Sequence, residues 1–164
     1  MAANAKSTLT IQARRTEFKE AIRIQQSLLA PIEKRFLIWL AHRTPPAINP
    51  DHLTILGFGA QIAAGILYAA SGRWRACLLL VNFCIALNWL GDSLDGTLAR
   101  VRNRQRPRYG FYVDHITDTF GAIAIMAGLA RSGSISERGA AVMLIGFLLL
   151  SVNSYLATYT IGDF

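Results

Sequence analysis

Hydrophobic residues are gathered in four long blocks that polar segments separate. The blocks run over Leu53–Ala70, Ala76–Gly91, Tyr109–Leu129 and Gly139–Tyr159. Each is close to the roughly 20 residues that an α-helix needs to cross a bilayer. The second block keeps helical periodicity beyond its apolar part, so its helix is expected to continue to Arg100. The pattern predicts an all-α, polytopic transmembrane helical bundle with four spans.

The chain before the first block is more polar. Residues 1–15 show no strong periodicity and are expected to form a disordered tail, whereas Glu17–Ala30 alternates apolar and charged residues as a helix does. Pro31 breaks that run and can begin a second helix, Pro31–His42. Twelve residues are too few to span a bilayer. We expect an N-terminal amphipathic helix in the membrane interface, with Trp39 at headgroup level. The alternative is a soluble helix that packs on a partner.

Composition agrees with a membrane protein. Of the 164 residues, 52% are hydrophobic and 16% charged, and the mean hydropathy is positive. The length fits one membrane domain, with juxtamembrane helices in 17–43 and transmembrane helices in 52–159. Cys77 and Cys84 lie seven residues apart in one predicted helix. That spacing corresponds to a rise of about 10 Å, too long for a disulfide.

The basic residues are placed unevenly along the chain. Thirteen of the 17 Lys and Arg precede residue 44 or lie in 100–108, and four lie in the connections after the first and third spans. By the positive-inside rule, the N-terminus and the arginine-rich loop are cytoplasmic. Topology and attraction to anionic headgroups explain the net charge of +7, so no nucleic-acid partner is expected.

Four carboxylates interrupt the apolar pattern. Asp92 and Asp95 are three residues apart, and Asp114 and Asp118 are four apart, so on helices each pair shares a face. A carboxylate at the bilayer centre costs about 2.5–3.5 kcal/mol on insertion scales. Hard divalent cations, Mg²⁺ or Mn²⁺, would compensate such charges. Two such ions can clamp a phosphate, while one carboxylate acts as general base towards a hydroxyl.

The spacing around these aspartates also resembles a known family. The pattern D-x-x-D-G-x-x-A-R, nine residues, then G-x-x-x-D-x-x-x-D is similar to the signature of the CDP-alcohol phosphatidyltransferases. Pro50, Asp51 and Thr54 extend the resemblance, although Asp51 also suits an N-cap of the first span. The positions that match the signature are Asp92, Asp95, Gly96, Ala99, Arg100, Gly110, Asp114 and Asp118.

The resemblance implies a transferase of phospholipid synthesis. It would move the substituted phosphate group of a CDP-linked donor to an alcohol and release CMP, with its active site facing the cytoplasm. Asp92, Asp95 and Asp114 would hold two divalent metals, and Asp118 would complete that site and deprotonate the acceptor. The donor would lie near Thr54, Gly96, Ala99, Arg100 and Gly110, and the loop arginines would contact phosphate. Membrane lipids and a second copy of the chain, in a homodimer, are the other partners that it implies.

Several alternatives stay open. Members of that family usually have six spans and this pattern has four, so a truncated or catalytically inactive member is one alternative. An intramembrane ion or proton transporter is another. His115 is either catalytic or a histidine of helix packing or headgroup contact; it directly follows Asp114 and so points to a different face of the helix, which speaks against catalysis. The acceptor alcohol is not specified, and neither is the choice between CDP-diacylglycerol and CDP-choline or CDP-ethanolamine.

Overall fold

The computed structural model describes residues 29–160, and every regular element in this range is an α-helix. The predicted tail 1–15 and nearly all of the predicted helix Glu17–Ala30 lie outside the described residues. The helices are α2 (Ala30–Arg43), α3 (Pro50–Ser71), α4 (Cys77–Val101), α5 (Pro107–Arg131) and α6 (Glu137–Thr160).

The predicted helices are present with small shifts at their ends. One uninterrupted helix, α4, carries the second apolar block and the first half of the aspartate pattern, as expected. The prediction that Asp51 caps α3 is wrong. The helix begins at Pro50 after Asn49, whose backbone N–H donates to His52 Nδ1 at 3.3 Å. Proline suits the first helical position, because the N–H that it lacks would have no partner there. The residue that precedes Pro50, Asn49, is therefore the N-cap.

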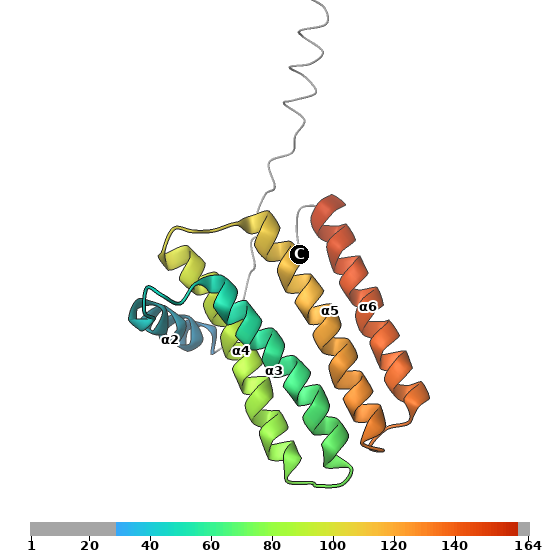
Figure 1. Cartoon of the computed structure of the whole chain (residues 1–164). Helices are drawn as coiled ribbons and strands as arrows, with labels where there is room; N and C mark the ends of the chain where they lie inside the picture. Colours follow the sequence, from blue (N-terminus) through green and yellow to red (C-terminus); the bar gives the residue numbers. More distant parts are fainter. Residues whose placement is uncertain (1–28, 161–164) are drawn as a thin grey trace, which may run out of the picture.

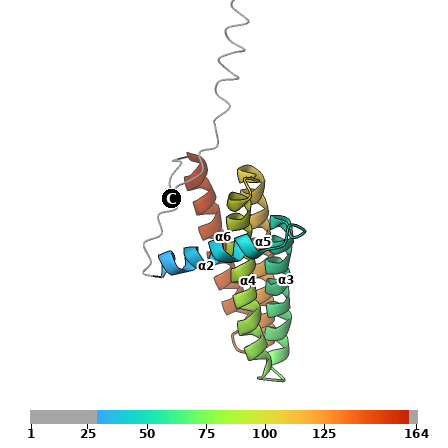
Figure 2. The ribbon, with the colours of Figure 1, turned by 90° about the vertical axis from the view of Figure 1, so that its left-hand side faces the viewer.

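The long helix α3 is the centre of the bundle. It packs against both α4 and α5, while α6 packs on α5 and α2 on α4. Figure 1 shows α3 to α6 running along a common direction, and Figure 2 shows α2 lying across them. The α2–α3 and α4–α5 connections lie at one end of the bundle, and the α3–α4 and α5–α6 connections lie at the other (Figure 1).

Glycines set how closely these helices approach. A Cβ on Gly91 of α4 would lie 2.7 Å from the backbone oxygen of Leu53 on α3. A Cβ on Gly128 of α5 would overlap the carbonyl of Gly65 on α3. Small residues at such contacts allow the backbones to pack tightly in lipid, where no hydrophobic effect draws helices together. These contacts fix the relative heights of α3, α4 and α5, and so of the side chains between them.

The interfacial candidate α2 docks on the bundle through one face. Leu37 and Ala41 are buried against a cluster formed by Leu53, Leu94 and Leu98. Its other apolar side chains, Ile32, Phe36 and Trp39, are exposed. This distribution suits a helix between the bundle and lipid, and its position in the interface stays a prediction.

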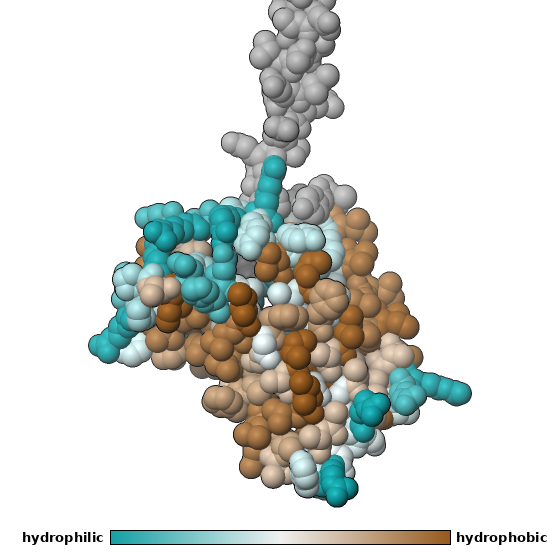
Figure 3. Space-filling model, viewed as in Figure 1, coloured by the Kyte–Doolittle hydropathy of each residue, from teal (hydrophilic) through white to brown (hydrophobic). Residues whose placement is uncertain are grey.

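The outer surface of the bundle is strongly apolar. Ile55 of α3, Leu79 of α4 and Leu150 of α6 are 67%, 74% and 72% exposed, and many other large apolar side chains are exposed with them. In the part of the chain that the structure describes, α3, α4 and α6 are long and apolar enough to cross a membrane. The fourth predicted span, in α5, carries more charge and stays a prediction. Figure 3 shows hydrophilic residues over the two ends of the bundle and an apolar region between them.

Candidate active site

A cleft of about 860 Å³ opens among α2, α3, α4 and α5. It is lined by the nine residues to which the family resemblance assigns catalysis, metal binding or donor binding. Those residues come from three helices and are separated by up to 64 positions in the chain, yet they face one space. They are Thr54, Asp92, Asp95, Gly96, Ala99, Arg100, Gly110, Asp114 and Asp118.

Helical periodicity explains why each set faces the cleft. Asp92, Asp95 and Ala99 of α4 recur at intervals of three and four residues, which places them on one stripe. On α5 the same holds for Gly110, Asp114 and Asp118. Because both helices pack against α3, their stripes are held on either side of the cleft.

The carboxylates of the two helices meet in this cleft. The Asp114 side chain is close enough to hydrogen-bond with that of Asp92, and the charges of Asp118 and Asp95 act on it as well. Within the described residues, neither Asp92 nor Asp114 forms an ion pair with Lys or Arg. Two carboxylates this close repel each other, and a cation between them would offset that repulsion.

The donor set suits a divalent metal by its chemistry. Four carboxylates supply the hard oxygen ligands that Mg²⁺ and Mn²⁺ prefer. The side chains as they stand are not gathered around one point, because no group of three His, Cys, Asp or Glu in residues 29–158 is arranged to hold a metal ion. A bound cation would have to draw Asp92 and its neighbours together. The residues therefore fit the ion in chemical type, and they line one cleft.

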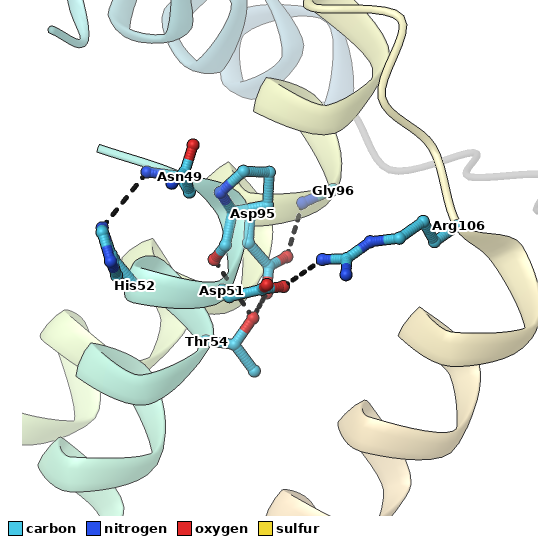
Figure 4. A network of polar contacts seen from close by, with 8 residues as sticks. Asn49, Asp51, His52, Thr54, Asp95, Gly96 and Arg106 are labelled. Carbon is cyan, nitrogen blue, oxygen red and sulfur yellow. Dashed lines mark hydrogen bonds and ion pairs between the residues drawn. The ribbon is translucent and has the colours of Figure 1, made fainter. Parts of the chain in front are cut away.

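Asp95 is held by neighbours on two helices (Figure 4). Thr54 Oγ1 of α3 donates to Asp95 Oδ2 at 2.5 Å, and the Gly96 backbone N–H donates to Oδ1 at 2.5 Å. Each carboxylate oxygen keeps a further lone pair for another ligand. Thr54 therefore ties α3 to the aspartate pattern of α4 at the level of the cleft.

An ion pair lies beside this network at the edge of the cleft. Arg106, just before α5, pairs with Asp51 in the first turn of α3 (Figure 4). Both side chains are about half exposed. The hydrogen bond to Asp51 raises the pKa of Arg106 above its ordinary value. The guanidinium also lies over the Tyr109 ring, 4.3 Å from the ring centroid.

The arginines of the α4–α5 segment divide into two groups. Arg100, Arg104 and Arg106 line the cleft. Arg102 does not, because its guanidinium donates to the backbone oxygens of Ile48, Thr44 and Pro45 at 2.5, 2.9 and 3.0 Å. The expectation that the loop arginines contact phosphate is thus compatible with three of the five side chains. Arg102 secures the α2–α3 connection, and Arg108 is absent from the lining of the cleft.

His115 lies outside the cleft. Its ring packs between Phe111 of the same helix and Tyr155 of α6, with centroid separations of 4.1 and 4.3 Å. Its Nδ1 is 2.6 Å from the Phe111 backbone oxygen. Of the two roles left open by the sequence, this geometry supports packing between α5 and α6.

Sequence reasoning missed several polar residues near the aspartates. Lys34 and Glu33 of α2 line the cleft, and the amides Gln61 and Asn88 lie beside Asp118. The two amides had a usable signal, because polar side chains within transmembrane runs are costly and are usually retained for a reason. The two α2 residues had none, since their place depends on how α2 docks.

Comparison with known proteins gives one family and two informative relatives. The model of the CDP-alcohol phosphatidyltransferase family matches residues 47–161. A phosphatidylinositol phosphate synthase of Cutibacterium acnes is 33% identical over 84 residues, which are 51% of this chain and 38% of that protein. An archaetidylinositol phosphate synthase of Pyrococcus horikoshii is 27% identical over 104 residues, which are 63% of this chain and 52% of that protein. The chain thus spans about half or less of the length of these relatives. No solved structure matches it.

Proposed function

Since the chain belongs to the CDP-alcohol phosphatidyltransferase family, we propose that it transfers the substituted phosphate group of a CDP-linked lipid to an alcohol and releases CMP. The observation that carries this proposal is the single cleft that all nine predicted site residues line. The chain is an integral membrane protein by its family and its three apolar helices. A membrane-embedded site suits a donor that is part lipid and part nucleotide.

Members of this family use a divalent metal ion. We propose that Asp92, Asp95, Asp114 and Asp118 hold it here, because they are the acidic residues of α4 and α5 that line the cleft. When bound, such an ion neutralises phosphate charge and polarises the phosphoryl group. Thr54 would keep the Asp95 carboxylate in place through its hydrogen bond.

The remaining residues would orient the donor and move a proton. Arg100 presents a planar guanidinium for phosphate, and its Nη2 donates to Thr97 Oγ1 at 3.2 Å, which holds the side chain beside the cleft. Gly96, Ala99 and Gly110 leave room for the donor against the helix backbones. Asp118 would take the proton of the acceptor hydroxyl as that oxygen attacks the phosphate.

The acceptor is proposed to be a phosphorylated polyol. In addition to Arg100, which is assigned to the donor, three cationic side chains line the same cleft: Lys34, Arg104 and Arg106. Both relatives are named for the synthesis of an inositol phosphate lipid. Cationic side chains at a water-accessible opening attract a doubly charged phosphate and fix its position.

The test is CMP release from CDP-diacylglycerol in the presence of Mg²⁺ or Mn²⁺, with inositol phosphate, glycerol phosphate, inositol and serine as acceptors. Turnover confined to the phosphorylated acceptors supports the whole proposal. Turnover with inositol or serine, but with neither of the phosphorylated acceptors, contradicts the acceptor assignment. No CMP from any acceptor would favour a catalytically inactive member, and metal uptake into vesicles without CMP release would favour a transporter.

Variants of the four aspartates distinguish a role in donor binding from a role in proton transfer. Changing Asp92, Asp95 or Asp114 to Ala should weaken donor binding and turnover together. Asp118→Asn should keep much of the donor affinity, while turnover falls by the roughly 10²–10⁴-fold typical of a lost general base. Equal loss of donor affinity in all four variants would make Asp118 an ordinary ligand.

The orientation and assembly belong to the proposal as well. The active site would face the cytoplasm, since the basic α4–α5 connection borders the cleft. In a background without Cys77 and Cys84, Gln105→Cys should label from the cytoplasmic side and Ser132→Cys from the other. Gln105 is preferable to Asn103, whose φ of 52° disfavours Cys. A homodimer is proposed from the family resemblance, and the mass of the detergent-solubilised protein tests it.

A further inference from the structure

A chain of three polar side chains crosses the bundle beside the aspartates. Gln61 of α3 stands in the middle, with its Nε2 3.5 Å from Asn88 Oδ1 of α4 and 3.4 Å from Asp118 Oδ1 of α5. Asn88 Nδ2 in turn lies 3.2 Å from the Gly57 backbone oxygen. The recess that these side chains border has a volume of about 10 Å³, far too small for a substrate.

The direction of these hydrogen bonds follows from the chemistry of their ends. A backbone carbonyl can only accept, so Asn88 must turn its NH₂ to Gly57 and its oxygen to Gln61. Gln61 must then donate to Asn88. The same Gln61 nitrogen lies 3.4 Å from Asp118 Oδ1, and because an amide N–H can only donate, the Asp118 oxygen accepts. All three donor and acceptor roles agree, so the orientation of the Gln61 amide is determined.

The space for this amide is made by a missing side chain. A Cβ on Gly121 of α5 would overlap the Gln61 amide. Gln61 Oε1 is buried and has no hydrogen-bond partner among the described residues. An unsatisfied buried oxygen costs free energy. The amide nevertheless lies where its nitrogen reaches Asp118, in a helix whose acidic and basic residues, Asp51 and His52, both lie in its first turn.

We propose that Gln61 is a positioning residue for Asp118, held in place by Asn88 and by the space at Gly121. The inference rests on the proposed function, in which Asp118 accepts the proton of the acceptor hydroxyl. By holding one oxygen of the carboxylate, Gln61 restrains its rotation and keeps it aligned with the reacting hydroxyl. A base displaced by about 1 Å can cost roughly 100-fold in rate. Because Gln61 is absent from the lining of the large cleft, donor binding should not depend on it.

Two variants displace this contact by different routes. Gln61→Ala removes the amide, and Gly121→Ala keeps the amide but pushes it away from Asp118. Each should lower kcat of CMP release roughly 10- to 100-fold, with the Kd for CDP-diacylglycerol within about twofold of wild type. Ile66→Ala, at a lipid-exposed position of α3, is the matched control and should keep wild-type kcat.

The double variant identifies the cause. If Gly121→Ala acts by displacing Gln61, it should lower kcat no further in the Gln61→Ala background, where there is no amide to displace. Additive losses would mean that each change disturbs packing independently, and would overturn the inference. Wild-type kcat in Gln61→Ala, or an equal loss of donor affinity and kcat, would overturn it too.

A readout apart from catalysis tests the contact itself. In ¹⁵N spectra of the protein in detergent, the Gln61 side-chain amide is identified by its loss in Gln61→Ala. Its resonances should shift in Asp118→Ala and stay in place in Ile66→Ala. Unmoved resonances in Asp118→Ala overturn the inference even if catalysis is intact. If wild-type protein releases no CMP, the proposed function fails while this spectrum still decides whether Gln61 holds Asp118.

Discussion

Replacing Arg102 by Ala should loosen the connection between α2 and α3. Three backbone oxygens of this connection, from Thr44, Pro45 and Ile48, accept hydrogen bonds from the Arg102 guanidinium. The Ile48 N–H also donates to the Pro45 oxygen at 3.0 Å, so the turn and the arginine stabilise each other. With alanine at position 102, the three carbonyls lose their charged donor together.

The expected magnitude follows from the number and type of bonds. A hydrogen bond to a charged group contributes about 1.5–3 kcal/mol in mutational series. Three bonds that share one guanidinium are not additive, and one of them is exposed to solvent. We therefore expect a loss of about 2–4 kcal/mol for the closed state of the connection. That corresponds to a roughly 30- to 1,000-fold rise in its open population.

Hydrogen exchange of the Ile48 amide measures this population directly, because exchange requires the turn to open. Arg104→Ala is the matched control: it removes the same charge from the same segment, and Arg104 faces the cleft. Arg102→Lys should give an intermediate rate, since an ammonium keeps the charge but lacks the planar fork. Equal exchange rates in Arg102→Ala and Arg104→Ala would refute the assigned role.

Three further outcomes are expected. Thr54→Val removes the hydrogen bond to Asp95 and should weaken CDP-diacylglycerol binding by about tenfold or more, whereas Thr54→Ser should bind normally; equal affinities would show that the bond is dispensable. Gly128→Ala places a methyl group against the Gly65 carbonyl and should lower the free energy of unfolding by about 1–3 kcal/mol. The methyl group of Gly146→Ala would meet open space, so this variant should keep wild-type stability. Similar melting temperatures of the two variants would contradict the close packing of α3 and α5. Chelation with EDTA should abolish CMP release and added Mg²⁺ or Mn²⁺ should restore it; full turnover in chelator would remove the metal from the proposal.

Much of the architecture could be predicted from local pattern. The runs that became α3, α4 and α6 are long and apolar, and a helix is the element that satisfies its own backbone in lipid. The aspartate spacing also predicted a shared face on α4 and another on α5, because helical periodicity is a property of the chain itself. Even so, the start of α3 was misplaced: Pro50 and Asn49 outweigh Asp51 as the signal for where that helix begins.

The tertiary structure decided which distant side chains meet. Arg102 and Ile48 are 54 residues apart, and Gln61 and Asp118 are 57 apart. Such contacts depend on the relative height and rotation of neighbouring helices, which close glycine contacts such as that between Gly91 and Leu53 set. Sequence spacing determines what lies along one helix, but it carries no information on the register between two helices. For this reason the aspartate pattern could be found in the chain alone, whereas the residues that hold it in place could be found only after the helices were packed together.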